Sequence, residues 1–275
     1  MSRPRDSPIE PPNDRPRGFI LGDPTFNPGL EHGFIISYNP TVDHNIVLDR
    51  RNGLRIGTGR LIPKKFIPPD DEITPQLLFP AGIGYRATPP VKRFIHRQNP
   101  RSFLVYTDGA CLGNGTANPR AGCGIVFRPE SHSADNYVRF ALESKGPRND
   151  LHPQTSNRAE LRAVIAACQF RIWSGEGFKT MVIATDSVYV VEGITTWIIG
   201  WIRREWRTNS RNLVKNRDLW ECLLGEIERA DEEGLDIQFW RIPREWNTDA
   251  DRHAKIAAAE ENRNENFTKR CGVLV

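Results

Sequence analysis

The chain has 275 residues, of which 38% are hydrophobic, so it can bury a core and is not disordered throughout. Its 38 Lys and Arg residues nearly balance 34 Asp and Glu residues, which excludes a histone-like or strongly acidic protein. No apolar run has the length of about 18 residues that a membrane span needs, and the polar, proline-broken start does not resemble a signal peptide. The five cysteines include no Cys-x-x-Cys pair. We therefore expect an intracellular protein of the nucleus or cytoplasm, without a disulfide framework or zinc finger.

Proline is concentrated in the first part of the chain: 16 of the 21 prolines lie in residues 1–100. Proline removes a backbone donor and disfavours helix interiors, which predicts an extended arm that packs along the next domain and is partly disordered at its start. Within this arm, residues 46–48 and 54–56 flank Asn52-Gly53, a typical hairpin turn. An independently folded N-terminal domain is the alternative.

An α/β pattern follows, and we assign residues 101–265 to one domain and 266–275 to a C-terminal tail. Thr155 or Ser156 is a suitable cap for the first helix of this domain. The predicted elements, in chain order, are strands at 103–106, 122–127 and 136–142, a helix from 155 to about 172, a strand at 180–184, helices at 187–201 and 213–233, a strand at 237–242 and a helix at 248–263. The first three strands form an antiparallel meander.

Four acidic residues stand where predicted strands end or predicted helices begin. Asp108 ends the first strand, Asp186 ends the fourth, Glu160 lies in the first turn of the first helix, and Asp251 opens the last helix. Each one alone is most simply a turn residue, a helix cap or a partner of the helix dipole. If the first and fourth strands are neighbours, however, Asp108 and Asp186 point into the same space and Glu160 can reach them.

Carboxylates gathered in this way repel one another, because their motifs contain no matching Lys or Arg. Such a cluster needs a cation, and hard oxygen ligands favour Mg²⁺ or Mn²⁺. Two such ions, about 3.5–4 Å apart, can clamp the attacking and leaving oxygens of a phosphodiester.

Four segments of the chain resemble type 1 ribonuclease H in residue sequence, order and spacing, over about residues 102–262. They are Tyr-Thr-Asp-Gly-Ala-Cys-Leu-Gly-Asn-Gly at 106–115, Thr-Ser-Asn-Arg-Ala-Glu-Leu at 155–161, Ala-Thr-Asp-Ser at 184–187 and Ala-Asp-Arg-His-Ala at 250–254. The resemblance implies a ribonuclease H-like fold: a five-stranded mixed sheet flanked by helices, here with a Pro-rich N-terminal extension. The matched catalytic acids are Asp108, Glu160, Asp186 and Asp251.

The resemblance also implies an endoribonuclease that hydrolyses the RNA strand of RNA–DNA hybrids and leaves 3′-hydroxyl and 5′-phosphate ends. The mechanism of the family uses two Mg²⁺ ions, for which Mn²⁺ can substitute. We expect a monomer. Matched positions give Asn114, Ser156 and Asn157 as contacts to RNA 2′-hydroxyls, the groups that distinguish RNA from DNA. For Asn114 the alternative is a left-handed loop residue between two glycines.

On the DNA strand, the resemblance implies a phosphate pocket that contains Thr155 and Asn216. An Arg that often helps this pocket in the family is replaced here by Pro153, so we expect either weaker phosphate binding or a substitute such as Arg158 or Lys215.

Tryptophans alternate with basic residues after the second helix of the domain. Aromatic faces pack on sugars or bases, and Arg and Lys neutralise phosphates. We expect Trp197 and Trp206 to contact the DNA strand, and Trp201 and Trp220 to belong to the core.

The loop at 242–249 departs from the family, because it lacks the His that many relatives carry there. His253 is not a substitute, since positions i and i+2 do not share a helix face, and we expect it to be a surface or packing residue. Glu245 is a candidate for a supporting role. We expect metal binding to be retained without this His, whereas the sequence does not determine the rate of turnover.

Two alternatives remain. One is a domain that binds hybrids but has lost catalysis, which the presence of all four acids disfavours. The other is a retroelement-derived ribonuclease H or a transposase-type enzyme, which the short chain without polymerase motifs disfavours.

Overall fold

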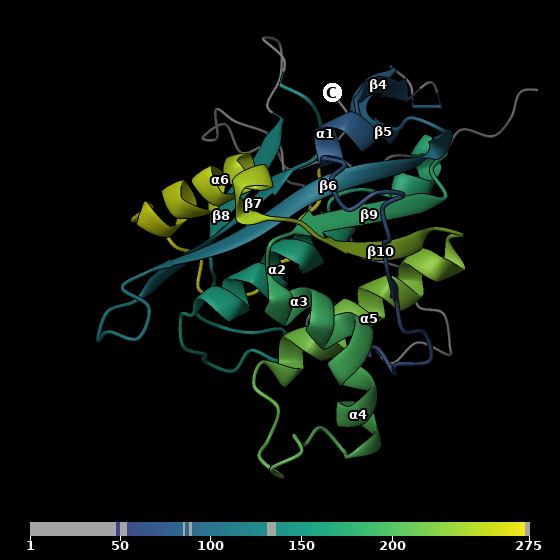
Figure 1. Ribbon diagram of the computed structural model, residues 1–275. Helices are drawn as coiled ribbons and strands as arrows, with labels where there is room; N and C mark the ends of the chain where they lie inside the picture. Colours follow the sequence, from purple (N-terminus) through teal and green to yellow (C-terminus); the bar gives the residue numbers. More distant parts are fainter. Residues whose placement is uncertain (1–47, 50–53, 85, 88–89, 131–135, 273–275) are drawn as a thin grey trace, which may run out of the picture. The chain divides into compact units, whose positions relative to one another are not determined.

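The computed structural model describes residues 48–49, 54–84, 86–87, 90–130 and 136–272 (Figure 1). The start of the arm that the sequence predicts, and the Asn52-Gly53 turn of its hairpin, lie outside these residues. The two strands of that hairpin are described: β1 (Leu48–Asp49) pairs antiparallel with β2 (Leu54–Arg55), which confirms the predicted pairing. The described residues all fall in one of two units of the chain, the one that spans residues 34–275.

A mixed sheet forms the centre of this unit and contains the five predicted strands. They are β6 (Asn99–Leu112), β7 (Arg120–Val126), β8 (Tyr137–Ala141), β9 (Thr180–Thr185) and β10 (Asp236–Arg241). β6, β7 and β8 are antiparallel, whereas β9 lies parallel to both β6 and β10. The predicted fold class is therefore confirmed. β6 is much longer than the predicted 103–106, because its second half continues to pair with β7 as far as Leu112.

Three further strands from before residue 100 widen the sheet to eight. They are β3 (Lys64–Lys65), β4 (Ala81–Gly84) and β5 (Val91–His96). β3 pairs parallel with β10, while β5 lies antiparallel to the first half of β6 and β4 completes the edge. These strands are short and each directly follows a proline, so the sequence pattern alone did not reveal them.

Helices cover both faces of the sheet, and Figure 1 shows α1 and α6 on one face and α2, α3 and α5 on the other. The helical segments are α1 (Pro75–Leu78), α2 (Ser156–Gln169), η1 (Trp173–Glu176), α3 (Val188–Glu192), a π-helical turn (Gly193–Trp197), α4 (Ile198–Arg203), α5 (Arg217–Glu232), η3 (Arg244–Trp246) and α6 (Thr248–Ala259). In the described residues, no helix combines the length and apolar character needed to cross a membrane.

Three predicted helices differ from the structure for local reasons, one by an interruption and two at their ends. The helix predicted at 187–201 is interrupted by the π-helical turn, whose Gly193 packs directly against the Trp220 ring. α5 begins at Arg217 rather than at 213, because Asn216 adopts a left-handed backbone with φ 57°. α6 ends at Ala259 because Glu260 is extended.

Two apolar clusters lie on opposite faces of the sheet. Alternate residues of β6 divide between them: Phe103 and Val105 belong to the larger cluster under α2 and α5, while Leu104 and Tyr106 belong to the smaller one. The smaller cluster also contains Leu78 and Phe79 from α1 and its C-terminal end, together with Ala250 of α6. Residues before 100 thus help to cover the face of the sheet that carries α6.

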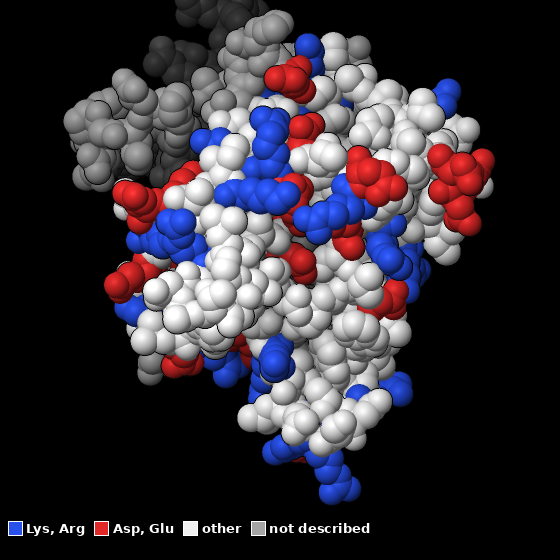
Figure 2. Space-filling model, turned by 60° about the vertical axis from the view of Figure 1, so that its left-hand side comes forward, with Lys and Arg blue, Asp and Glu red and all other residues white. Residues whose placement is uncertain are grey.

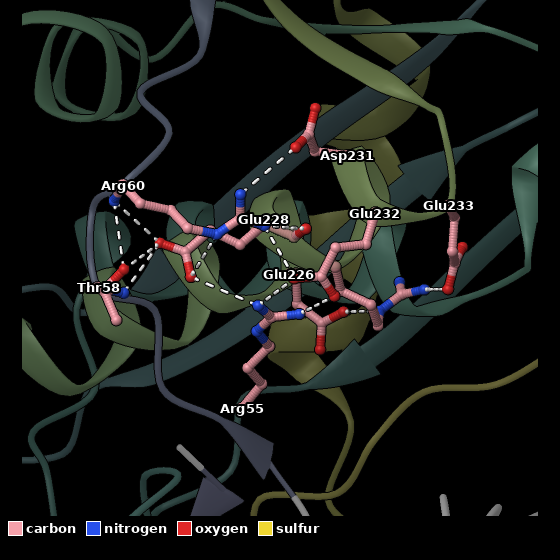
Figure 3. Close-up of polar contacts among 9 residues, drawn as sticks. Arg55, Thr58, Arg60, Glu226, Glu228, Asp231, Glu232 and Glu233 are labelled. Atoms are coloured by element: carbon pink, nitrogen blue, oxygen red, sulfur yellow. Dashed lines mark hydrogen bonds and ion pairs between the residues drawn. The ribbon is translucent and has the colours of Figure 1, made fainter. Parts of the chain in front are cut away.

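A strap of residues 54–60 lies along α5 (Figure 3). One carboxylate oxygen of the buried Glu228 accepts hydrogen bonds from the backbone N–H groups of Thr58, Gly59 and Arg60, at 2.9, 2.8 and 3.2 Å. The strap and the helix touch through their backbones, since a Cβ on Gly57 would lie 2.3 Å from the Gly225 nitrogen. The strap is therefore fitted to α5 by both charge and shape.

Residues 266–272 also pack on the domain. Phe267 is buried in the larger cluster, and the Arg162 guanidinium donates to the Thr268 carbonyl at 2.7 Å. Arg270 donates to the buried Glu143 at 3.0 Å.

Candidate active site

The register of β6 and β9 places Asp108 beside Asp186. The two strands are parallel neighbours, and Tyr106 is paired with Ala184. Asp108 lies two positions after Tyr106, and Asp186 lies two positions after Ala184, so both acids lie at the same edge of the sheet. Because side chains alternate along a strand, both also lie on the face that carries α6.

Glu160 approaches the same edge from α2. Thr155 caps this helix, and its hydroxyl accepts a hydrogen bond from the Arg158 N–H at 3.3 Å. The first turn of the helix rests directly on β6, because a Cβ on Gly109 would lie 2.1 Å from the Glu160 nitrogen. Only glycine permits this approach, which gives the Asp-Gly pair of the motif a structural reason. The Ser187 hydroxyl then donates to Glu160 Oε2 at 2.5 Å and fixes the carboxylate next to the end of β9.

Asp251 completes the group from the first turn of α6. Its neighbours are cations: Arg244 Nη2 lies 2.9 Å from Asp251 Oδ1, and Lys255 Nζ lies 2.6 Å from Asp251 Oδ2. Arg244 Nη1 also lies 4.0 Å from Asp186 Oδ2. This arginine belongs to the loop before α6 and lies outside the four motifs, so the motifs alone did not predict a matching cation.

Asn247 links the acids to the ends of the central strands, and the sequence did not predict this role. Its side-chain amide donates to Asp186 Oδ1 at 2.9 Å and to the Thr107 carbonyl at 3.1 Å. Asn247 is buried, so these bonds link the loop before α6 to the ends of both central strands. An Asn four residues before an Asp carries no signal in a single sequence that could have identified this role.

The acids interact electrostatically. Burial, together with the nearby Asp186, Glu160 and Asp251 carboxylates, raises the pKa of Asp108 to about 7. Burial also raises the pKa of Glu160, while the hydrogen bond from Ser187 opposes this shift. Both pKa values are raised because several negative charges lie close together in a site that is partly shielded from solvent. A bound cation would relieve this repulsion.

The donor chemistry fits divalent metal ions, although the side chains are not arranged as a finished metal site. Among the residues that the structure describes, no three His, Cys, Asp or Glu side chains form a ready-made metal-binding group. Carboxylate oxygens are the ligands that Mg²⁺ and Mn²⁺ prefer, and the mutual repulsion at Asp108 provides the driving force.

The residues expected to contact RNA lie on two adjoining segments. Asn114 is exposed in the loop between β6 and β7. The left-handed positions of this loop are Gly113 and Gly115, with φ 65° and 82°, so Asn114 is not needed for that conformation. Ser156 and Asn157 occupy the first turn of α2, where Asn157 is exposed and Ser156 is partly buried.

The residues expected to contact the DNA strand divide into accessible and buried ones. Trp197 is 40% exposed and lines an open groove of about 430 Å³ together with Trp201, Arg204 and the loop at 208–210. Trp201, expected in the core, is only partly buried and contributes to this groove. Trp206 is 9% exposed and packs in the core under the Arg217 guanidinium, so it offers little surface to a ligand. Trp220 is fully buried.

Asn216 is held in place by Arg158, which is itself buried. Arg158 donates to Asn216 Oδ1 at 3.3 Å and forms two hydrogen bonds with Asp218, at 2.9 and 2.6 Å. Its charge is therefore compensated by Asp218, and it supports the asparagine from within rather than facing a phosphate. Thr155 is partly buried at the start of α2.

Two further residues of interest lie near α6. Glu245 is exposed in η3, and in the described contacts it is Arg244, its neighbour, that reaches the acids. His253 is buried and stacks on Tyr137 with ring centroids 3.7 Å apart, as a packing residue does.

Comparisons with known proteins show which family the chain belongs to. The family model for RNase H matches residues 100–258, more than half of the chain. Human "Ribonuclease H1" is 31% identical over 62% of this chain and 55% of its own length, and "Ribonuclease H" of Treponema pallidum is 39% identical over 44% of this chain and 70% of its own length. The crystal structure of "LC9-RNase H1, a type 1 RNase H with the type 2 active-site motif" is 26% identical over 60% of this chain and 76% of that chain, with a TM-score of 0.41. The matched part of the human protein is thus only about half of that protein. On the family match, this chain belongs to the ribonuclease H family.

Proposed function

We propose that the chain is a divalent-metal-dependent endoribonuclease that hydrolyses the RNA strand of RNA–DNA hybrids. The observation that carries the proposal is the register of β6 and β9, which aligns Asp108 and Asp186 at one sheet edge while Glu160 and Asp251 arrive from α2 and α6. Electrostatic coupling of Asp108 to the other three acids supports a shared cation site. The names of the similar proteins support the reaction type.

In this proposal Asp108, Glu160, Asp186 and Asp251 hold two Mg²⁺ ions, or Mn²⁺ in their place. When bound, such ions would activate water for attack on the phosphorus and stabilise the 3′ oxygen as it leaves, so that the products would carry 3′-hydroxyl and 5′-phosphate ends. The chain's own contribution is preorganisation: Ser187 fixes the Glu160 carboxylate, and Asn247 fixes Asp186 against the end of β6.

Substrate selection follows from the positions around the acids. Asn114, Ser156 and Asn157 would contact RNA 2′-hydroxyls, whereas Thr155, Asn216 and the groove at Trp197 would hold the DNA strand. Figure 2 shows Lys and Arg side chains interspersed with Asp and Glu on the face that it displays, rather than one continuous basic field. Affinity would therefore depend on specific sugar, base and phosphate contacts as well as on overall charge.

The second candidate function is the binding of RNA–DNA hybrids without cleavage, by a protein of the same family. Under either function we propose that the protein is intracellular and monomeric. Arg244, which pairs with two of the four acids, is the observation that favours it. The loop at 242–249 also lacks the histidine that many relatives carry there.

A single substrate panel separates these functions. The full chain is incubated with a labelled RNA–DNA hybrid, double-stranded RNA or double-stranded DNA, in Mg²⁺, Mn²⁺ or a chelator. We expect cleavage of the RNA strand of the hybrid alone, only with metal, and products that a 5′-phosphate-dependent exonuclease degrades. Hybrid binding without cleavage in either metal would establish the second candidate, and cleavage of double-stranded DNA would reject both.

A further inference from the structure

The loop before α6 directs a cation at the acids. η3 turns the chain at Arg244–Trp246, and from this turn the Arg244 side chain reaches Asp251 at 2.9 Å and Asp186 at 4.0 Å. The carboxylates in turn raise the pKa of Arg244, Asp251 most strongly, followed by Asp186 and Asp108. Arg244 is thus a counter-charge that two acids of the cluster share.

A second cation occupies the remaining oxygen of Asp251. Lys255, one turn further along α6, lies 2.6 Å from Asp251 Oδ2, while Arg244 contacts Oδ1. Both oxygens of Asp251 are therefore committed to side chains of this protein. By contrast, the hydrogen bonds described for Asp186 and Glu160 come from the neutral donors Asn247 and Ser187, which leave the negative charge in place.

We propose that Arg244, assisted by Lys255, competes with the divalent ion for Asp251 and Asp186 and thereby weakens metal binding by this chain. The inference rests on the proposed metal-dependent function. The positive charges of Arg244 and Lys255 repel a divalent ion at the carboxylate that they neutralise, so an ion bound at Asp251 must offset this repulsion or displace the existing pairings. The Arg244 side chain is 69% exposed and that of Lys255 is 55% exposed, so both can leave into solvent without breaking the fold.

The contacts also rank the competitors. Arg244 reaches two acids, whereas the ion pair of Lys255 is with Asp251 alone. Arg252, on the same helix, pairs instead with the exposed Asp249 at 3.1 Å. Arg252 is therefore a matched control: its removal changes the net charge of the chain by the same amount without freeing Asp251.

The test measures Mn²⁺ binding by calorimetry and electron paramagnetic resonance, on the full chain without nucleic acid. The variants are Arg244→Gln, Lys255→Gln and Arg252→Gln, with Asp108→Asn to identify binding at the acids. Because partly exposed ion pairs are worth up to about 1 kcal/mol, we expect Arg244→Gln to bind Mn²⁺ roughly three- to fivefold more tightly. Lys255→Gln should show a smaller gain and Arg252→Gln none.

The outcomes separate this inference from the proposed function. Wild-type binding that Asp108→Asn does not reduce would overturn the metal site itself. Wild-type binding at the acids with unchanged or weaker affinity in Arg244→Gln would overturn only the competition. An equal gain in Arg244→Gln and Arg252→Gln would also overturn it, because general charge would then be the cause.

Discussion

At the scale of single residues, the site depends on carboxylates that are held close together at an energetic cost. Asp108 is 6% exposed, and burial together with three neighbouring acids raises its pKa to about 7. In an unfolded chain the pKa of an Asp is about 3.9. The folded protein therefore binds this proton more tightly than the unfolded chain does. The associated stability is complete below pH 4 and is lost as pH rises through 7.

Asp108→Asn should accordingly stabilise the protein in the presence of a chelator. We expect a gain in unfolding free energy on the order of 2–4 kcal/mol at pH 8, which declines steadily toward pH 4. Urea unfolding at several pH values measures it, with the exposed Asp249→Asn as the control. A loss of stability at pH 8, or a gain that does not vary with pH, would contradict the electrostatic account of the site.

Trp197 offers a test of the DNA-strand groove. Its ring is 40% exposed at the groove wall, and stacking of a base or sugar on such a ring is worth about 1–3 kcal/mol. Trp197→Ala should weaken hybrid binding, measured by fluorescence anisotropy in chelator, by about tenfold or more. Ile199→Ala removes a similarly exposed apolar side chain that does not line the groove. An equal effect of both variants would mean that the groove is not used.

The sequence located the four acids because their motifs stand at strand ends and helix starts, where topology alone brings residues together. It could not locate Arg244 or Asn247, because their roles depend on the direction in which η3 turns. The expectation for Trp201 was right in part: this ring packs against the core cluster, but it also lines the groove. Helical spacing shows which residues share a face, but not how far each emerges from it.

At the scale of elements, the strap of residues 54–60 is held by one buried acid of α5. Glu228 accepts three backbone hydrogen bonds and one from the Thr58 hydroxyl, at 3.0 Å. Removal of this carboxylate leaves three part-buried N–H groups without this partner, which costs more than the bonds themselves contributed. Its neighbour Glu232 pairs with Arg55 through a side chain that is 45% exposed.

Glu228→Ala should therefore lower the free energy of unfolding by about 2–4 kcal/mol, whereas Glu232→Ala should cost less than about 1 kcal/mol. Chemical denaturation of both variants beside the wild type measures the difference. Similar losses for the two variants would show that the buried acid has no special role in holding the strap.

Element boundaries were predictable where one residue fixes them and not elsewhere. Thr155 identified the start of α2, because a Thr or Ser directly before a helical pattern is a strong capping signal. The left-handed Asn216 and the π-helical turn at Gly193–Trp197 carry no comparable signal, so the neighbouring helices were predicted too long.

At the scale of the whole molecule, residues before 100 contribute to the same core as the family domain. Leu78 and Phe79 are buried on the α6 face of the sheet. Arg93 is buried as well and forms two hydrogen bonds with Glu176, at 3.0 and 2.8 Å. A fragment that begins at residue 100 would lose these groups and leave a buried acid without its β5 partner.

We expect the 100–275 fragment to lose the cooperative thermal unfolding of the full chain. Near-ultraviolet circular dichroism during heating compares the two proteins, and the Trp signals report the packed core directly. A 100–275 fragment that melts cooperatively at the temperature of the full chain would show that the preceding strands are dispensable.

We propose that four acids at one sheet edge bind metal, and that this metal site hydrolyses the RNA strand of a hybrid. Cleavage by the full chain and by Asp186→Asn and Asp249→Asn, in Mg²⁺ and in chelator, tests it most directly. Asp186 belongs to the cluster, and Asp249 is an exposed acid only two residues before Asp251. The account predicts Mg²⁺-dependent cleavage by the full chain and Asp249→Asn, and none by Asp186→Asn. Undiminished cleavage by Asp186→Asn, or by the full chain in chelator, would contradict it.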